Sequence, residues 1–396
     1  MGRCSVDSRE ISAMKTASIS EPVKTGPPEA KVRDARFEDY EQIAALQERN
    51  GLASKPREEW EHLWTHNPEY RKVPNLPIGF VIEDAKGEVV GYTALIQLSY
   101  QFEGREVSAT SGWGMAVDPP YRGLTNALIR RVVSPEASEF QVDASAKPNV
   151  ARILDVVLVR RKVGGRIPAG DWDNASFWIT NYRGFLRSAI KAKGLPGMLS
   201  YPAAGAMWLR DSLRGANSWA KRGQGHVEPC NGFDGRFDQF WEELKRAYPN
   251  RYLATRSREV LQWHFHYALA ANKLWILTVG HGSRILAYSV FRRQDNPQLN
   301  LTRVRLIDFQ VINGDNQLLV PMLAWALRKC QQEGIHMLEA YGFRSDKQNV
   351  IESLAPHRRP LPAWCFFYAT HNKALKQKLE NPDVWDPSHF DGDESL

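Results

Sequence analysis

Residues 115–128 have the residue types and spacing that best suit a phosphorylated ligand. A strand-like run ends in Asp-Pro-Pro, and Tyr-Arg-Gly then opens a predicted helix. Backbone N–H groups at a helix start carry the positive end of its dipole and bind anions. Arg122 adds a positive charge, and Gly123 lets the backbone approach a ligand closely. The pattern predicts a pyrophosphate site; its alternative is a plain strand–turn–helix connection with a surface arginine.

Other familiar site patterns are missing from the sequence. It contains no GxxxxGK[ST] loop, no GxGxxG dinucleotide fingerprint and no GxSxG nucleophile motif. His264 and His266 lie two residues apart on a predicted helix, so they point to different faces. No acid stands at ligand spacing from them, and we expect no metal site.

Two residues are candidates for acid–base chemistry. Asp143 lies on a short predicted strand after the motif helix, and a carboxylate can take up a proton. Tyr182 could donate a proton. Each has an ordinary alternative: Asp143 as a turn acid and Tyr182 as a packed aromatic.

Composition excludes several classes of protein. The 396 residues are 43% hydrophobic and 24% charged, which is typical of globular chains. The longest apolar runs, 153–159 and 318–327, are far shorter than the ~20 residues that span a bilayer. The four cysteines are scattered without metal or disulfide spacing, so we expect a reduced, cytoplasmic protein. A net charge of +7, spread along the chain, makes nucleic acid an unlikely partner.

The elements that would position these residues occur twice along the chain. Hairpins are predicted at 78–98 and 274–292, and each is followed by a strand, a loop and a helix, over 106–133 and 304–333. A repeated α+β unit explains the length better than two unrelated α/β domains with a similar rhythm. We expect five regions: a disordered leader 1–31, a first domain 32–188, a connector 189–235, a second domain 236–375 and a C-terminal tail 376–396. A helix is predicted within the connector, over 207–218.

The segment 117–128 resembles the Q/R-x-x-G-x-G/A loop of the GCN5-related N-acetyltransferase (GNAT) superfamily. Thr125 stands where that motif has its second glycine, which makes close backbone approach less assured there. The predicted elements from residue 32 to about 185 follow the order of the superfamily fold. The resemblance implies an α/β (α+β) fold of two tandem GNAT-like domains, each with a mixed central sheet flanked by helices.

The resemblance also implies acetyl-CoA, or another acyl-CoA, as co-substrate. Its pantetheine arm would pair with a strand edge and its pyrophosphate would lie on the loop, with one further contact from an asparagine on the next helix. The implied residues are Met115, Ala116, Val117, Arg122, Gly123, Leu124, Thr125, Asn126 and Asn149.

The second half resembles a degenerate copy of the first. Its corresponding loop, 313–317, lacks the arginine and carries Asp315, whose charge would repel a pyrophosphate. We therefore expect a single CoA site, in the first half.

The function that this resemblance implies is transfer of an acyl group to the amine of a small molecule, sugar or peptide, with Asp143 and Tyr182 as catalytic candidates. One alternative is an aminoacyl-tRNA-dependent transferase similar to the Fem enzymes, which also double this fold. Another is a GNAT-fold binding protein without activity. The sequence leaves the acceptor and the oligomeric state open.

Overall fold

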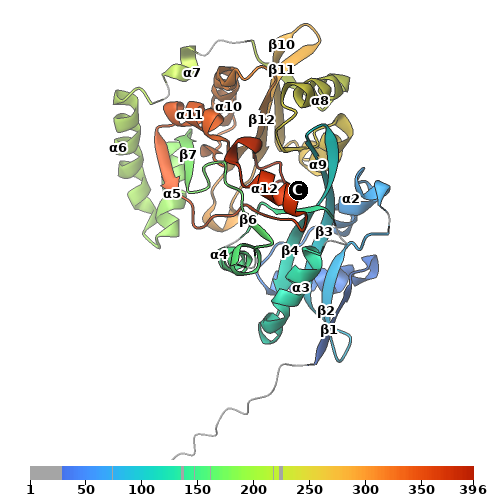
Figure 1. Cartoon of the computed structure of the whole chain (residues 1–396). Helices are drawn as coiled ribbons and strands as arrows, with labels where there is room; N and C mark the ends of the chain where they lie inside the picture. The colour runs from blue at the N-terminus through green and yellow to red at the C-terminus, as the bar shows by residue number, and fades with distance from the viewer. Residues whose placement is uncertain are drawn as a thin grey trace, which may run out of the picture.

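A computed structural model describes residues 29–396 except 74, 135–137, 147, 161, 217 and 223–225. Two sheets form the body of the molecule, the first near the N-terminal elements and the second beside it (Figure 1). Residues 1–28, most of the predicted leader, lie outside the described residues. Strand β1 begins at Ala30, two residues before structure was expected.

The first sheet has the order β1-β2-β3-β4-β5-β15-β6, and β9 pairs with β3. Strands β1 to β4 are antiparallel, whereas β4 and β5 are parallel. The predicted first hairpin is confirmed as β2 and β3. The bounds are β1 Ala30–Asp34, β2 Gly79–Asp84, β3 Val89–Phe102, β4 Arg105–Val117, β5 Phe140–Asp143, β6 Gly164–Arg166, β9 Leu253–Ala254 and β15 Phe367–Ala369.

Helices cover both faces of this sheet because successive side chains of β3 point to opposite faces and both faces carry apolar residues. Ala94 and Ile96 pack in the core shared with α1 and α2, whereas Leu95 packs with Leu128 and Val132 of α3. Helix α4 follows β5 and continues as one turn of π-helix, Asp155–Arg160. The bounds are α1 Tyr40–Arg49, α2 Arg57–Thr65, α3 Thr125–Val132 and α4 Pro148–Leu154.

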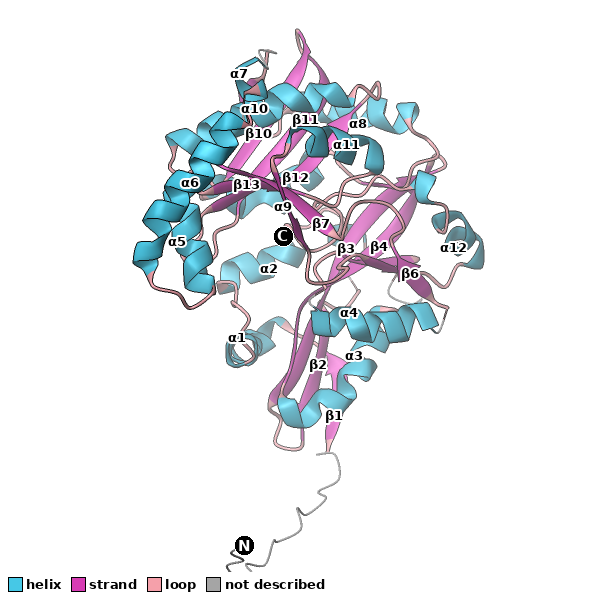
Figure 2. Ribbon diagram, turned by 90° about the vertical axis from the view of Figure 1, so that its left-hand side faces the viewer, coloured by secondary structure: helices cyan, strands magenta, loops and turns pink. Residues whose placement is uncertain are grey.

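The second sheet has the order β14-β7-β13-β12-β11-β10-β8. Tyr288 and Val290 of β11 pack in the core with α8 and α9, whereas Ala287 and Phe291 pack with α10, so helices again cover both faces (Figure 2). The bounds are β7 Asn174–Ile179, β8 Glu228–Cys230, β10 Leu274–His281, β11 Arg284–Arg293, β12 Arg303–Val311, β13 Met337–Ala340, β14 His357–Pro360, α8 Gly235–Ala247, α9 Arg258–Ala270, α10 Leu319–Gln332 and α11 Ser345–Leu354. Two helix-flanked mixed sheets were predicted, and this is confirmed.

The two halves of the chain exchange strands. Strand β7 precedes residue 188, yet it pairs with β13 and β14 in the second sheet. Strand β15 comes from the second half, yet it pairs with β5 and β6 in the first sheet. The domain bounds 32–188 and 236–375 therefore divide the sequence but do not divide the hydrogen-bonded sheets.

The predicted connector 189–235 begins inside a helical hairpin. Helix α5 covers Tyr182–Ala192 and α6 covers Ser200–Leu213, followed by the short α7, Trp219–Arg222. A helix was predicted over 207–218, which is wrong at both ends. The apolar pattern gave the wrong bounds because α6 exposes most of its large apolar side chains and buries Ser200, Ala204 and Asp211, with Met207 packed partly inward.

The predicted C-terminal tail is an ordered part of the interior. Helix α12, Lys373–Leu379, lies against the first half, and residues 385–396 are then almost all buried. Two acids hold this segment in place: Asp391 accepts from Arg256 Nη2 at 3.2 Å, and Asp386 accepts from Lys347 Nζ at 2.7 Å. In the described part of the chain, no helix combines the length and apolar character that crossing a bilayer requires.

Candidate active site

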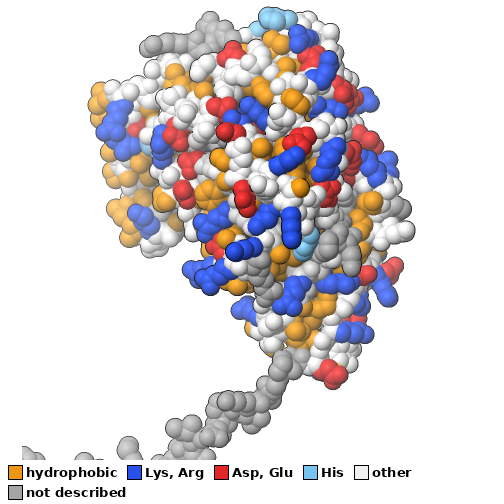
Figure 3. Space-filling view, in the orientation of Figure 1, with side chains coloured by type: hydrophobic (Ala, Val, Ile, Leu, Met, Phe, Trp, Pro, Cys, Tyr) orange, Lys and Arg blue, Asp and Glu red, His pale blue; other side chains and the backbone are white. Residues whose placement is uncertain are grey.

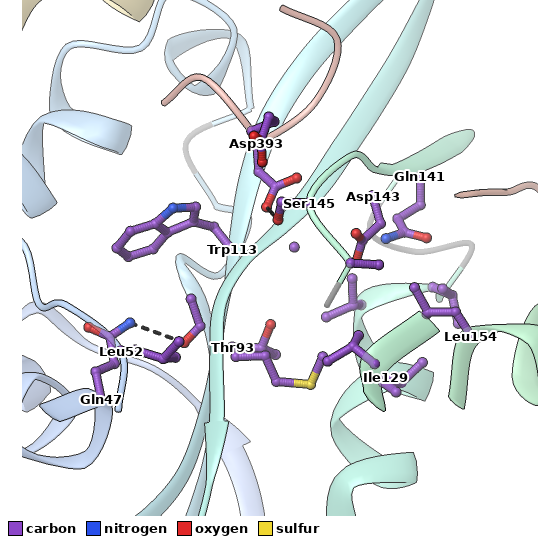
Figure 4. A pocket seen from close by; sticks show the side chains of 18 of the residues that line it. Gln47, Leu52, Thr93, Trp113, Ile129, Gln141, Asp143, Ser145, Leu154 and Asp393 are labelled. Atoms are coloured by element: carbon purple, nitrogen blue, oxygen red, sulfur yellow. Dashed lines mark hydrogen bonds between the residues drawn. The ribbon is translucent and has the colours of Figure 1, made fainter. Parts of the chain in front are cut away.

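A cavity of about 320 Å³ opens where strands β4 and β5 separate. The two strands pair only from Ala109 to Ser111 on β4 and from Phe140 to Val142 on β5. Beyond Ser111 the edge of β4 that faced β5 has no strand partner among the described residues. The cavity is lined from α1, β3, β4, α3, β5, α4 and the C-terminal segment (Figure 4). A free strand edge beside a cavity can pair with an extended ligand.

A β-bulge in β4 shapes the wall of this cavity. Gly114 and Met115 together lie opposite the single residue Thr93 of β3. Gly114 has φ +66°, and a Cβ atom there would lie 2.4 Å from Nε2 of Gln47. That amide donates a hydrogen bond to the Gly114 carbonyl at 3.0 Å (Figure 4). Bulges bend a strand and redirect its side chains, and here Met115 lines the cavity.

Three carboxyl groups lie at one end of the cavity: Asp143 at the end of β5, with Asp393 and Glu394 of the C-terminal segment. Asp393 accepts hydrogen bonds from the Ala144 N–H at 3.1 Å and from the Ser145 hydroxyl. Glu394 accepts from Nη1 of Arg305 at 2.5 Å.

Burial raises the pKa of two of these carboxyl groups, Asp143 and Asp393. It raises the pKa of Asp143 well above its usual value, and the negative charge of Asp393 raises it further. Burial also raises the pKa of Asp393, but the hydrogen bonds from Ser145 and Ala144 limit the rise to about 6. Oδ1 of Asp143 has no hydrogen-bond partner among the described residues. Both carboxyls are therefore shifted toward their protonated forms, and only Asp393 has side-chain and backbone donors that oppose the shift through its own carboxylate oxygens.

The predicted CoA residues run along β4 to the start of α3. Met115 lines the cavity, while Ala116 and Val117 are buried and pair with β3. A 3₁₀ turn, Pro119–Leu124, then leads into α3. This turn and the start of α3 contain the remaining loop candidates: Arg122, Gly123, Leu124, Thr125 and Asn126.

The loop does not line the cavity, but it is open at Arg122 and Gly123. Arg122 is exposed and makes no hydrogen bond or ion pair within the described part of the chain. A Cβ atom at Gly123 would have nothing within 4 Å. Among the described residues no side chain caps the start of α3, although the Thr125 N–H already donates to the Arg122 carbonyl of the preceding 3₁₀ turn. Asn149 is exposed on α4, beside Val150 of the cavity wall.

Tyr182 is not among the residues that line the cavity. It begins α5 beside the second sheet, and its hydroxyl donates to Asp211 of α6 at 3.0 Å. The same carboxylate binds Nε2 of His357 at 2.8 Å. Burial and Asp211 both raise the pKa of Tyr182. Strand β7 belongs to the second sheet, so the helix that follows it places Tyr182 away from the cavity. This placement corresponds to the packed-aromatic alternative.

Sequence reasoning missed Gln47, Asp393 and Glu394. Gln47 is an ordinary residue of an amphipathic helix, and nothing in its spacing points to the β4 bulge. The two acids lie in the run Asp391-Gly392-Asp393-Glu394, directly after Phe390. Such a run resembles a solvated tail, and only its burial identifies it as part of the cavity.

The equivalent strand separation in the second half is filled by the chain itself. Strands β12 and β13 pair over only three residues, from Arg303 to Arg305 on β12. Beyond them, Lys347 Nζ donates to the Phe309 carbonyl at 2.8 Å. At the following loop, the Asp315 carboxylate accepts from the Gln317 N–H at 3.1 Å and so occupies one N–H group at that helix start. Among the described residues, no cluster of three or more His, Cys, Asp or Glu is arranged to bind a metal ion.

No protein-family model matches the sequence, and neither does any curated protein. Solved structures do match it. Saccharomyces cerevisiae N-myristoyltransferase with bound myristoyl-CoA is similar over 88% of this chain and 80% of its own, with TM-score 0.52 and 10% identity. A GCN5-related N-acetyltransferase from Kribbella flavida matches over 86% and 72%, with TM-score 0.50 and 12% identity. A protein from Enterococcus faecalis V583, described as a probable N-acyltransferase, matches over 86% and 72%, with TM-score 0.52 and 11% identity.

At these identities the likeness concerns the fold. It extends over most of the chain and includes both sheets, in agreement with the repeated unit expected from the sequence. The chain has the tandem GCN5-related N-acetyltransferase fold.

Proposed function

We propose that this protein is an acyl-CoA-dependent N-acyltransferase with its active site in the cavity between β4 and β5. One observation carries the proposal: a single cavity joins the free edge of β4, next to the open Arg122-Gly123 loop, to a pair of buried carboxyl groups. The structural neighbours include N-acyltransferases, which supports the same reaction class.

The residues at this site fit an acyl-CoA. Arg122 and the uncapped start of α3 supply positive charge for a pyrophosphate, and the missing Cβ of Gly123 leaves room for it. The free β4 edge offers backbone groups to a pantetheine arm, for which Met115 and the α3 residues Ile129 and Val132 provide apolar contacts. Bound acyl-CoA would supply the thioester.

The carboxyl pair suits an amine acceptor. Ionised Asp393 would attract a protonated amine and take up one of its protons, which frees the nitrogen lone pair to attack the thioester carbon. The carbon–sulfur bond then breaks as Asp143 gives its proton to the leaving thiolate, and the second proton lost from the nitrogen returns to Asp143. The chemistry calls for an amine on a small molecule, sugar or peptide, in a cytoplasmic setting where acyl-CoA is available.

Thermal stabilisation tests the proposal most directly. A ligand at 100 times its Kd adds about 2.7 kcal/mol to the free energy of unfolding. We expect acetyl-CoA or a longer acyl-CoA to raise the melting temperature, and Arg122→Glu to abolish that rise without changing the melting temperature of the free protein. Lys86→Glu, on the exposed turn between β2 and β3, is the matched control for charge.

Release of free thiol in the presence of an amine panel then tests for turnover. Stabilisation by tRNA and by no acyl-CoA would instead indicate the Fem-like alternative. Stabilisation by acyl-CoA without turnover on any amine would indicate a binding protein.

A further inference from the structure

The helical hairpin formed by α5 and α6 exposes large apolar side chains. Met198 and Leu213 are 75% and 80% exposed. Five further side chains are each about half exposed: Leu195, Leu199, Tyr201, Trp208 and Leu209. In the rest of the described chain, the large apolar side chains that are exposed are valines, at positions 73, 156 and 159. A concentration of this kind marks an interaction surface.

Helix α6 is amphipathic in the opposite sense to a surface helix that packs on a core. The side chains it buries are small or polar: Ser200, Ala204 and Asp211. Its exposed positions carry Tyr201, Trp208, Leu209 and Leu213. A helix normally turns its apolar side chains toward the protein interior. Packing on the second sheet therefore does not account for the outer face of α6.

The same hairpin is strongly basic. Between Asp173 and Glu228 the sequence has a single acid, Asp211, which is buried and bound to Tyr182, His357 and Arg210. Exposed cations follow along the two helices and their loop: Arg183, Arg187, Lys191, Lys193, Arg210 and Arg214. Figure 3 shows apolar and basic side chains together at the outer edge of the molecule, where Figure 1 draws α6.

We propose that the outer face of the α5–α6 hairpin binds peripherally to an anionic lipid surface, with both helices lying along it. Apolar side chains would enter the headgroup–acyl boundary, and the surrounding lysines and arginines would contact the lipid phosphates. Trp208 and Tyr201 suit this boundary because each has an apolar ring and a polar group.

Charge argues for a lipid surface over a second copy of the chain. A symmetric dimer through this face would bring two basic hairpins together, with no exposed acid on either hairpin to offset the repulsion. An anionic membrane offers the opposite charge and an apolar layer at the same place. The inference does not depend on the proposed enzyme activity.

Vesicle co-sedimentation of the full chain tests the proposal. We expect binding to vesicles of equal parts phosphatidylglycerol and phosphatidylcholine, and at least tenfold weaker binding to phosphatidylcholine alone. The double variant Met198→Ser/Leu213→Ser removes the most exposed apolar side chains, and Arg187→Glu/Lys191→Glu reverses two charges. Each should weaken binding to the mixed vesicles at least tenfold, with an unchanged melting temperature because all four side chains are exposed.

Val156→Ser and Lys86→Glu, on other surfaces, are the matched controls and should bind like the wild type. Equal affinity for both vesicle types, or mixed-vesicle binding that survives both double variants, would overturn the proposal. A third result would also overturn it: the protein does not bind vesicles, light scattering shows a dimer, and Met198→Ser/Leu213→Ser dissociates that dimer. That result would assign the surface to self-association.

Discussion

Asp143 and Asp393 show how one cavity can place two like groups in different surroundings. Oδ1 of Asp143 has no hydrogen-bond partner among the described residues, and burial and the nearby charge of Asp393 raise the pKa of this carboxyl. Asp393 accepts from Ser145 and from a backbone N–H, which favours its ionised form. Environments that separate the pKa values of paired carboxyls are typical of acid–base sites.

Replacement of these carboxyls separates catalysis from binding. We expect Asp393→Asn to lower kcat on an amine acceptor by about 10²–10⁴-fold, because the base that takes the proton is lost. Stabilisation by acyl-CoA should remain, since Asp393 lies away from Arg122 and Gly123. Steady-state kinetics and melting curves provide the two readouts. If Asp393→Asn has the same kcat as the wild type, Asp393 is not the base that takes the proton.

The same carboxyl makes stability depend on pH. The folded protein holds the Asp393 proton up to about pH 6, whereas the reference pKa is 3.8. Its contribution is therefore complete below pH 3.8 and is lost as the pH rises through about 6. Asp393→Asn removes this loss, so the free energy of unfolding of the variant should rise relative to the wild type between these two pH values.

Urea unfolding across this pH range gives the comparison. Glu41→Gln, which alters an exposed carboxylate of α1, is the control and should follow the wild type. A variant-minus-wild-type difference that stays flat or falls as the pH rises would contradict the assignment.

At the scale of elements, two glycines have different reasons to be glycine. Gly114 has a positive φ and touches Gln47, so the fold itself requires it. Gly123 has open space around its missing Cβ and an ordinary backbone, so folding alone does not require it. The fold therefore requires a glycine in the β4 bulge, whereas a requirement for glycine at position 123 would come from the proposed ligand.

Alanine at each position tests this contrast. Gly114→Ala forces a strained backbone and displaces Gln47, so we expect a loss of about 1–3 kcal/mol in the free energy of unfolding. Gly123→Ala should leave stability unchanged but weaken acyl-CoA binding, measured by calorimetry, because its methyl group occupies the ligand's space. Unchanged affinity in Gly123→Ala would place the pyrophosphate elsewhere.

At the scale of the whole molecule, the two halves are joined more closely than a tandem repeat requires. They exchange β7 and β15, and the C-terminal segment brings Asp393 to a cavity built mainly by the first half. Arg256 connects these parts. It follows β9 of the first sheet, binds Asp308 of β12 through Nε at 2.8 Å and binds Asp391 of the C-terminal segment.

Loss of Arg256 should therefore affect the entire chain. Burial opposes ionisation of Asp308, but the charge and hydrogen bonds of Arg256 lower its pKa to about 2. Arg256→Met leaves buried carboxyls without their partner, and we expect a loss of about 3–5 kcal/mol in the free energy of unfolding. Fluorescence and circular dichroism should report one common unfolding transition. Two separate transitions would show that the halves unfold independently.

Local signals in the sequence predicted much of the fold. The hairpins β2–β3 and β10–β11 have alternating apolar residues around a glycine-containing turn, and both occur where expected. The strand–loop–helix from β4 to α3 also follows its local pattern. Helix α6 was misplaced because its apolar face is exposed, so periodicity did not indicate which side is buried.

By itself, the sequence predicted the repeated unit, the strand–loop–helix around Arg122 and Gly123 and the candidate Asp143, because turns, periodicity and motif spacing act between residues close in the chain. Only the tertiary structure decided that β7 and β15 change sheets, that Tyr182 lies outside the cavity and that Asp393 lies inside it. These outcomes depend on burial and hydrogen bonding between residues far apart in the sequence. Such contacts form only when the whole chain packs, and no local pattern encodes them.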